Sequence, residues 1–188
     1  MISQVAENVW KLDADSNVYF LNFDKKIIID TGRRSNRHLL EQYLPKVVDF
    51  SNIEIVIFTH LHYDHIGNFD LFSNAKFYAS KQEIADFNEN KNNAVLDENI
   101  ADIFNVELNE LPENIEGLKV IETPGHTRGS ICLWYEKDKI LFTGDTIFRN
   151  KRITGRTDLP TSSPDEIRES IMKLLDYNFK IICPGHDY

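Results

Sequence analysis

Short apolar segments rich in β-forming residues recur along this chain in two sets, and a helix-like segment follows each set. The first set runs from Val9 to Asp30 as VWKLD, NVYFLNF and KKIIID, broken by polar pairs, which predicts an antiparallel meander. The second set contains LKVIET, SICLWYE and KILFTG, with Lys137-Asp138 as a tight turn. Two sets of strands with helices after them predict an α+β protein, a four-layer αββα sandwich in which two sheets pack together with helices outside.

Three other segments have helical character. Apolar residues recur at helical spacing between residues 35 and 50, although Pro45 weakens the prediction in the middle of that helix. A polar stretch at residues 81–104, rich in Asn and Glu, is expected to be a helical excursion. The segment 164–177 predicts a helix with Pro164 in its first turn and a buried stripe made of Ile167, Ile171, Leu174 and Leu175.

The length and composition suit one globular domain. The chain has 188 residues, of which 41% are apolar and 27% charged, so it can bury a core without a covalent crosslink. We therefore expect residues 1–188 to form a single domain. Cys132 and Cys183 each lie in an apolar run, which predicts two buried, reduced thiols.

The charge distribution excludes several classes of partner. A formal net charge of -9 and the lack of a long Lys/Arg run argue against nucleic acid, whose phosphates are bound by clustered cations. The N-terminal MISQVAENVWKLDAD has no apolar signal core, and no apolar stretch approaches the length of a membrane span. We expect a cytoplasmic protein with neither a nucleic acid nor a membrane partner. The oligomeric state is left open.

Five of the six histidines fall in loops that follow apolar segments. The strand-like IEIVIF leads directly into THLHYDH, and the loops PGHT, TGDT and PGHDY follow later in the chain. The sixth histidine, His38, has no motif around it and is expected at the surface. The candidate ligands in these loops are His60, His62, Asp64, His65, His126, Asp145 and His186.

Nitrogen and carboxylate donors without thiolate favour Zn²⁺, and also suit Fe²⁺ or Mn²⁺. Seven donors exceed what one tetrahedral ion needs, so they predict two ions about 3.5–4 Å apart that share a carboxylate. A closed structural site would be rich in thiolates, so this donor set favours catalysis. Spacing alone does not show which donor serves which ion.

These motifs, in this order, resemble the metallo-β-lactamase superfamily, and specifically its glyoxalase II-like hydrolases. The resemblance covers nearly the whole chain, from the IIIDTG turn at Asp30 to PGHDY. It implies the metallo-β-lactamase type of αββα sandwich. It also implies a first metal on His60, His62 and His126, a second on Asp64, His65 and His186, and Asp145 bridging both.

The chemistry implied is hydrolysis by a metal-bridging hydroxide. Metal-bound water has a pKa of about 7, so hydroxide is available near neutral pH to attack a thioester or ester carbonyl. The metals then stabilise the oxyanion and the leaving group, and no Ser or Cys nucleophile is required. Asp64 and Asp145 are the expected catalytic carboxylates, and Asp64 can also take up a proton during turnover.

The resemblance also suggests residues around the metals. Asp30 and Thr59 are expected to orient the ligands from behind. Glyoxalase II enzymes carry an appended helical domain that grips glutathione, and this chain is expected to lack that domain. Arg156 and Tyr188 resemble two substrate-binding residues of the family. The loop FRNKRITGR is slightly longer than the family pattern, and the alternative interpretation of Arg156 is a simple surface cation.

Other readings compete with the hydrolase. The stretch GRTDLP and the PGHDY region also resemble persulfide dioxygenases, which use one iron on the counterparts of His60, His126 and Asp145. Asp145 in place of cysteine argues against a β-lactamase of the main zinc-dependent class, and His62 in place of glutamate against a flavodiiron oxygen reductase. An RNase Z-like nuclease fits the ligands but not the charge, and a metal-binding protein without turnover is the remaining alternative.

Overall fold

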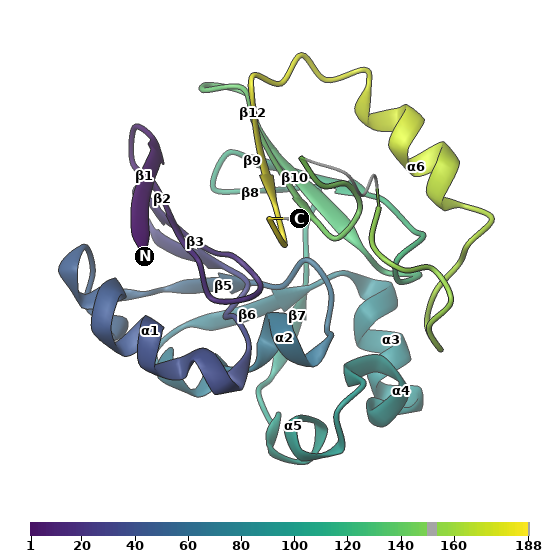
Figure 1. Ribbon diagram of the computed structural model, residues 1–188, viewed down its shortest axis with the longest axis horizontal. Helices are drawn as coiled ribbons and strands as arrows, with labels where there is room; N and C mark the ends of the chain where they lie inside the picture. The colour runs from purple at the N-terminus through teal and green to yellow at the C-terminus, as the bar shows by residue number, and fades with distance from the viewer. Residues whose placement is uncertain (150–153, 188) are drawn as a thin grey trace.

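The computed structural model describes residues 1–149 and 154–187, and its core is a pair of β-sheets packed face to face (Figure 1). The first sheet has strands in chain order: β1 (Ile2–Ala6), β2 (Val9–Leu12), β3 (Val18–Asn22), β4 (Lys26–Ile29), β5 (Ile55–Ile57), β6 (Lys76–Ala79) and β7 (Leu108–Glu110). The second sheet has the order β12 (Ile181–Pro184), β11 (Ile140–Gly144), β10 (Ile131–Tyr135), β9 (Leu118–Glu122) and β8 (Asn114–Ile115).

Strand direction decides where the functional loops meet. The expected meander is confirmed, because β2, β3 and β4 pair antiparallel, and β1, which we did not expect, extends it. From β4 to β7 the strands run parallel, and β11 and β12 are also parallel. Parallel strands end at the same edge of a sheet, so the loops after β4 and β5 are neighbours, as are those after β11 and β12.

Alternating side chains divide the core into layers. In the first sheet Phe20, Ile28 and Val56 face the helices, whereas their neighbours along the strands, such as Leu21 and Ile57, face the second sheet. A third cluster packs Leu174 of α6 (Ile167–Leu174) against the outer face of the second sheet. Three buried clusters separate four layers, which confirms the αββα sandwich (Figure 1).

The helices on the first sheet follow the expected segments with shorter bounds. The helix predicted at 35–50 is limited to α1 (Arg37–Tyr43), because Pro45 lies in a separate 3₁₀ turn at Leu44–Lys46. The excursion at 81–104 is helical, as α3 (Lys81–Glu89), α4 (Lys91–Val95) and α5 (Glu98–Ile103). A further short helix, α2 (Tyr63–Ile66), carries part of the histidine cluster.

The prediction for the last helix was partly wrong. α6 begins at Ile167, so Pro164 lies before the helix and not in its first turn. Leu175 is 65% exposed, whereas Ser170 and Leu174 are the buried residues of this helix. The buried face of α6 does not include Leu175, because the helix ends one residue earlier, at Leu174.

The end of β12 is fastened to the first sheet. The side chains of Asn17 and Tyr19 both donate hydrogen bonds to the Pro184 carbonyl, at 3.0 and 2.7 Å, and the Asn17 amide donates to the Gly185 carbonyl at 2.6 Å. Cys132 and Cys183 are buried free thiols, and His38 is exposed, as predicted. Within residues 1–149 and 154–187 no helix has the length and apolar character of a membrane span.

Candidate metal centre

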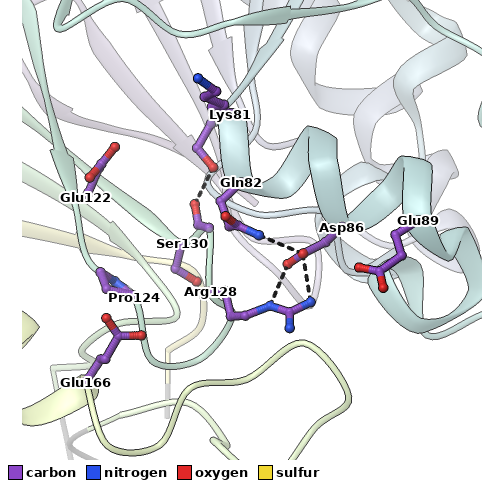
Figure 2. A pocket seen from close by; sticks show the side chains of 11 residues that line it. Lys81, Gln82, Asp86, Glu89, Glu122, Pro124, Arg128, Ser130 and Glu166 are labelled. Carbon is purple, nitrogen blue, oxygen red and sulfur yellow. Dashed lines mark hydrogen bonds and ion pairs between the residues drawn. The ribbon is translucent and has the colours of Figure 1, made fainter.

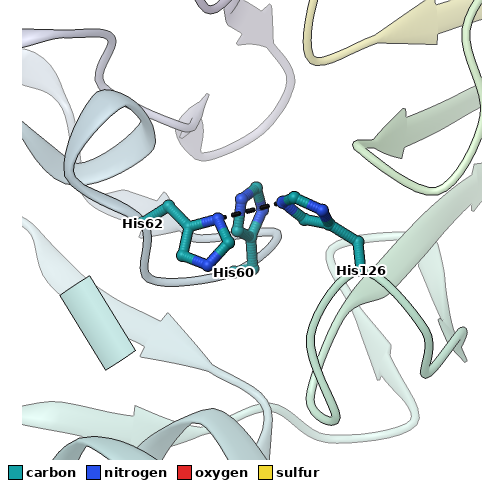
Figure 3. Close-up of side chains that lie close together, drawn as sticks. All are labelled: His60, His62 and His126. Carbon is teal, nitrogen blue, oxygen red and sulfur yellow. Dashed lines mark hydrogen bonds between the residues drawn. The ribbon is translucent and has the colours of Figure 1, made fainter. Parts of the chain in front are cut away.

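The seven predicted ligands come together at the ends of strands from both sheets. The loop after β5 carries four of them, and the loops after β9, β11 and β12 carry one each. Figure 3 shows His60 and His62 from the first half of the chain facing His126 from the second. All five histidines and Asp145 are buried, and Asp64 is partly buried. The fold therefore brings all seven side chains together.

Their donor atoms form three overlapping groups in which all atoms lie within 4.8 Å of one another. The first group joins the loops after β5 and β9, the second joins the loops after β5 and β11, and the third joins the loops after β5 and β12. The groups are His60, His62 and His126; His60, His65 and Asp145; and Asp64, His65 and His186. The first and third groups have no member in common.

Asp145 lies between these two groups. Its Oδ2 is 3.6 Å from Nε2 of His126 and 3.5 Å from Nε2 of His186, and its Oδ1 is 3.4 Å from Nε2 of His65. These separations exceed ordinary hydrogen bonds but suit two donors on one ion. A carboxylate has two oxygens, so Asp145 can serve both groups.

Hydrogen bonds behind the rings fix which nitrogen faces the centre. Nδ1 of His126 is 2.6 Å from the Arg156 carbonyl, and Nδ1 of His186 is 2.9 Å from the Asp15 carbonyl. A carbonyl only accepts, so each Nδ1 carries the proton and a neutral ring presents the Nε2 lone pair to the cluster. This is the tautomer that a metal ligand requires.

Asp30 and Thr59 orient the imidazoles of His65 and His60 in the same way. Nδ1 of His65 lies 2.8 Å from Oδ2 of Asp30, and Nδ1 of His60 lies 3.1 Å from Oγ1 of Thr59. Thr59 donates its own proton to Asp30 at 2.8 Å, so its oxygen is left to accept from His60. The structure thus places Asp30 and Thr59 directly behind the cluster.

The donor set passes a test of fit for divalent cations. Four buried atoms in the cluster have no hydrogen-bond partner among the described residues: Nε2 of His60, His62 and His65, and Oδ1 of Asp145. Buried polar atoms without partners are rare and costly in folded proteins. Lone pairs gathered in this way are satisfied by a cation, so these residues can hold metal ions.

The ionisation of His60, His62 and Asp64 is consistent with that role. Burial, reinforced by the neighbouring imidazoles, lowers the pKa of His60 well below its usual range, and burial beside His126 lowers the pKa of His62 to about 3. Burial raises the pKa of Asp64, but the His186 hydrogen bond and the charge of His65 outweigh it and bring that pKa to about 2. Neutral imidazoles and ionised carboxylates are the forms that bind metal.

Residues 13–186 match the family model described as the metallo-beta-lactamase superfamily. The chain belongs to the metallo-β-lactamase superfamily. It is 34% identical over 187 residues to a probable metallo-hydrolase of Methanocaldococcus jannaschii, covering 91% of this chain and 87% of that protein. A hydroxyacylglutathione hydrolase of Francisella tularensis subsp. novicida is 27% identical over 180 residues, covering 92% of this chain and 67% of that protein.

Solved structures agree on the metallo-β-lactamase fold. A metallo-beta-lactamase family protein of Thermus thermophilus superposes with a TM-score of 0.78 at 20% identity, covering 98% of this chain and 75% of that chain. The protein TTHA1623, solved in a di-iron-bound form, gives a TM-score of 0.71 at 21% identity, covering 92% of this chain and 88% of that chain. These likenesses concern the fold alone.

In this member of the superfamily, α3 fastens two ligand loops together. Glu83 is 2% exposed and accepts hydrogen bonds from the Leu61 amide at 2.8 Å and from the Thr127 hydroxyl. Sequence reasoning missed Glu83, although Ser80-Lys81-Gln82-Glu83 has the spacing of a capping box. Its carboxylate instead reaches between the loop after β5 and the loop after β9.

The same helix holds the residues after His126. The Ser80 hydroxyl donates to the Gly129 carbonyl at 2.7 Å, and the Arg128 guanidinium donates to Asp86 at 2.7 and 3.2 Å. Figure 2 shows this pair beside a hollow between α3 and the loop after β9. Ser80, Glu83 and Asp86 therefore restrain the loop that carries His126.

Close packing at Gly185 explains the glycine of the metallo-β-lactamase motif PGHDY, which we had not singled out. A Cβ at this position would collide with Oδ1 of Asp145 and lie 2.8 Å from Cε1 of His65. Only a residue without a side chain lets the loop after β12 approach the cluster this closely. The bare Gly185 backbone therefore sets the spacing between the loops after β11 and β12.

The predicted substrate residues have different outcomes. Arg156 is exposed and lines the pocket over the cluster, where its guanidinium pairs with Asp158 at 2.9 Å. Its carbonyl holds His126, a role that no side-chain motif can reveal. Tyr188 lies outside the described residues.

Proposed function

We propose that this chain is a binuclear metal-dependent hydrolase that cleaves thioesters or esters of small molecules. One metal is held by His60, His62 and His126, the other by Asp64, His65 and His186, with Asp145 shared between them. We propose Zn²⁺ at both sites, and the nitrogen and oxygen donors also suit Fe²⁺ or Mn²⁺. Asp145 carries this proposal, because its two oxygens face both ligand groups at 3.4–3.6 Å.

When bound, two divalent cations supply an acidified water and Lewis acidity toward a carbonyl oxygen. The chain supplies the arrangement that this chemistry needs. Backbone carbonyls, Asp30 and Thr59 keep four imidazoles in one tautomer, and Gly185 keeps Asp145 beside His65. Asp64 is 18% exposed at its side chain and lines the pocket, so it can pass a proton between substrate and solvent.

Two findings support hydrolysis. The relatives include probable metallo-hydrolases and a hydroxyacylglutathione hydrolase. The described lining of the pocket over the cluster contains no Ser or Cys nucleophile, so attack by an activated water suits this site better than covalent catalysis.

Metal analysis combined with two assays tests the proposal. The protein should take up two metal equivalents per chain and hydrolyse an acyl thioester, with activity lost to a chelator and restored by Zn²⁺. Oxygen uptake with glutathione persulfide serves as the comparison arm. A single tightly held iron, oxygen uptake and no thioester hydrolysis would instead establish the mononuclear dioxygenase.

A further inference from the structure

Leu96 has an unusual backbone conformation. It follows α4 with φ 65° and ψ 15°, the left-handed region that glycine or asparagine normally occupies at the end of a helix. A leucine there is strained by its Cβ, and such strain persists only where the surroundings enforce it. Glycine would satisfy the backbone better, so the leucine side chain needs another explanation.

The surroundings hold Leu96 firmly in place. Its amide donates to the Asn92 carbonyl at 2.9 Å, which closes the last turn of α4. The next residue, Asp97, caps α5 by accepting the Ile100 amide at 3.0 Å. Ala94 and Val95 before it are buried. Leu96 is therefore the short link between two capped helices, and its backbone has little freedom.

The Leu96 side chain lines the pocket over the metal cluster. The same pocket, of about 200 Å³, is lined by His62, Asp64, His126, Asp145 and His186. Two other apolar side chains, Phe148 and Leu159, belong to its wall, and they come from segments more than 50 residues away along the chain. The polar excursion 81–104 thus contributes an apolar group to the proposed reaction site.

The guanidinium on this wall already has a partner. Arg156 is the one Lys or Arg among the described lining residues, and Asp158 pairs with it at 2.9 and 3.0 Å. An anionic group would therefore compete with Asp158 for Arg156. The three apolar side chains offer an uncharged chain a surface from which water is readily displaced.

We infer that Leu96, Phe148 and Leu159 form a subsite for the aliphatic acyl chain of the substrate. This inference rests on the proposed hydrolase and specifies its substrate class: thioesters of short, uncharged aliphatic acids. A pocket of about 200 Å³ lies below the size of most sites for larger ligands, roughly 300–1,000 Å³, which suits a short chain. The strain at Leu96 is then retained for substrate contact and not for stability.

The test uses Leu96→Gly and Leu96→Asn, because both residues accept the left-handed backbone. Lys139→Gly is the matched control, since Lys139 also has a positive φ, 56°, but lies in the turn between β10 and β11. Acetyl and hexanoyl thioesters of one thiol measure chain-length preference. An NMR titration with hexanoate measures the affinity of the pocket for an acyl chain, which does not depend on turnover.

Both Leu96 variants should lower the ratio of hexanoyl to acetyl kcat/KM about tenfold and weaken hexanoate binding by a similar factor. Their urea unfolding midpoints should stay at or above that of the native protein, as for Lys139→Gly, whose chain-length ratio should not change. Unchanged ratios and hexanoate affinity, or a large loss of stability in Leu96→Gly, would overturn the subsite. If the native protein hydrolyses no thioester, the proposed function fails while hexanoate binding still decides the subsite.

Discussion

Oδ2 of Asp30 lies 2.8 Å from Nδ1 of His65, and both side chains are buried. The carboxylate holds the imidazole in the tautomer whose Nε2 faces Asp145. Burial lowers the pKa of His65, but the charges of Asp145 and Asp30 outweigh it and raise that pKa well above its usual range. This position therefore favours positive charge, either a proton or a metal.

Asp30→Asn should weaken metal binding about 10- to 100-fold. An amide nitrogen facing Nδ1 favours the tautomer with the proton on Nε2, which removes the lone pair that a metal needs. Asparagine also tolerates the φ of 56° at this position, so the backbone should persist. Competition with a fluorescent chelator measures the affinity. Asp70→Asn, which removes a surface ion pair with Arg34 and Arg37, is the control, and equal affinities in the two variants would contradict the prediction.

Asp145→Ala should lower the metal content, whereas Arg156→Ala should leave it unchanged. Asp145 faces both ligand groups, so its loss should remove metal and abolish hydrolysis. Arg156 contributes its carbonyl to His126, which alanine retains, so metal content should stay intact while KM rises. Elemental analysis measures the metal content of both variants, and thioester kinetics measure their kcat and KM. Two retained metals and a near-normal rate in Asp145→Ala would show that Asp145 does not join the sites.

Glu83 should make the metal-free protein less stable as the pH rises. Burial raises the pKa of Glu83 to about 7, against 4.5 ordinarily, although hydrogen bonds from Thr127 and Leu61 oppose the shift. The folded state therefore keeps a proton that the unfolded state loses. Stability from this group is complete below about pH 4.5 and is lost up to about pH 7, on the order of 3 kcal/mol in all.

Urea unfolding with a chelator present, at pH values from about 5 to about 8, measures this loss against Glu83→Gln. The variant cannot titrate at this position, so the native protein should lose stability relative to it as the pH rises. A constant difference between the two proteins across that range would show that Glu83 does not titrate there.

The two thiols should be inert in the folded protein. Burial raises the pKa of Cys132 to about 11 and that of Cys183 to about 12. Because the thiolate is the reactive form, a disulfide reagent at about pH 8 should label neither residue until urea is added. Both should then react at the rate of free cysteine. Rapid labelling of one thiol in the native protein would show that its strand opens locally.

The strands and the ligand loops could be predicted because their signals are local. Apolar runs such as IEIVIF and IIID identify strands by themselves, and each ligand loop follows such a run. The exposed Leu175 and the late start of α6 could not be predicted, since helical spacing does not show where a helix ends. Tertiary packing decides such boundaries.

Other parts of the site depend on contacts between distant segments. Glu83 follows a capping-box pattern, yet its carboxylate bonds Leu61 and Thr127 in two other loops. The Asp15 and Arg156 carbonyls that orient His186 and His126 have no side-chain signature at all. Leu96 lies within residues 81–104, which we predicted only as a polar helical excursion. A single sequence identifies the ligands better than the groups that hold them.

The attachment of Pro184 to Asn17 and Tyr19 bears on how the site is assembled during synthesis. Four ligands are present once residue 65 has been made, but His186 is held by the Asp15 carbonyl across 171 residues of chain. The group of Asp64, His65 and His186 therefore stays incomplete until β12 has emerged from the ribosome and docked on the first sheet. A chain that stops before β12 should therefore lack the third donor of this group, even when its first sheet has folded.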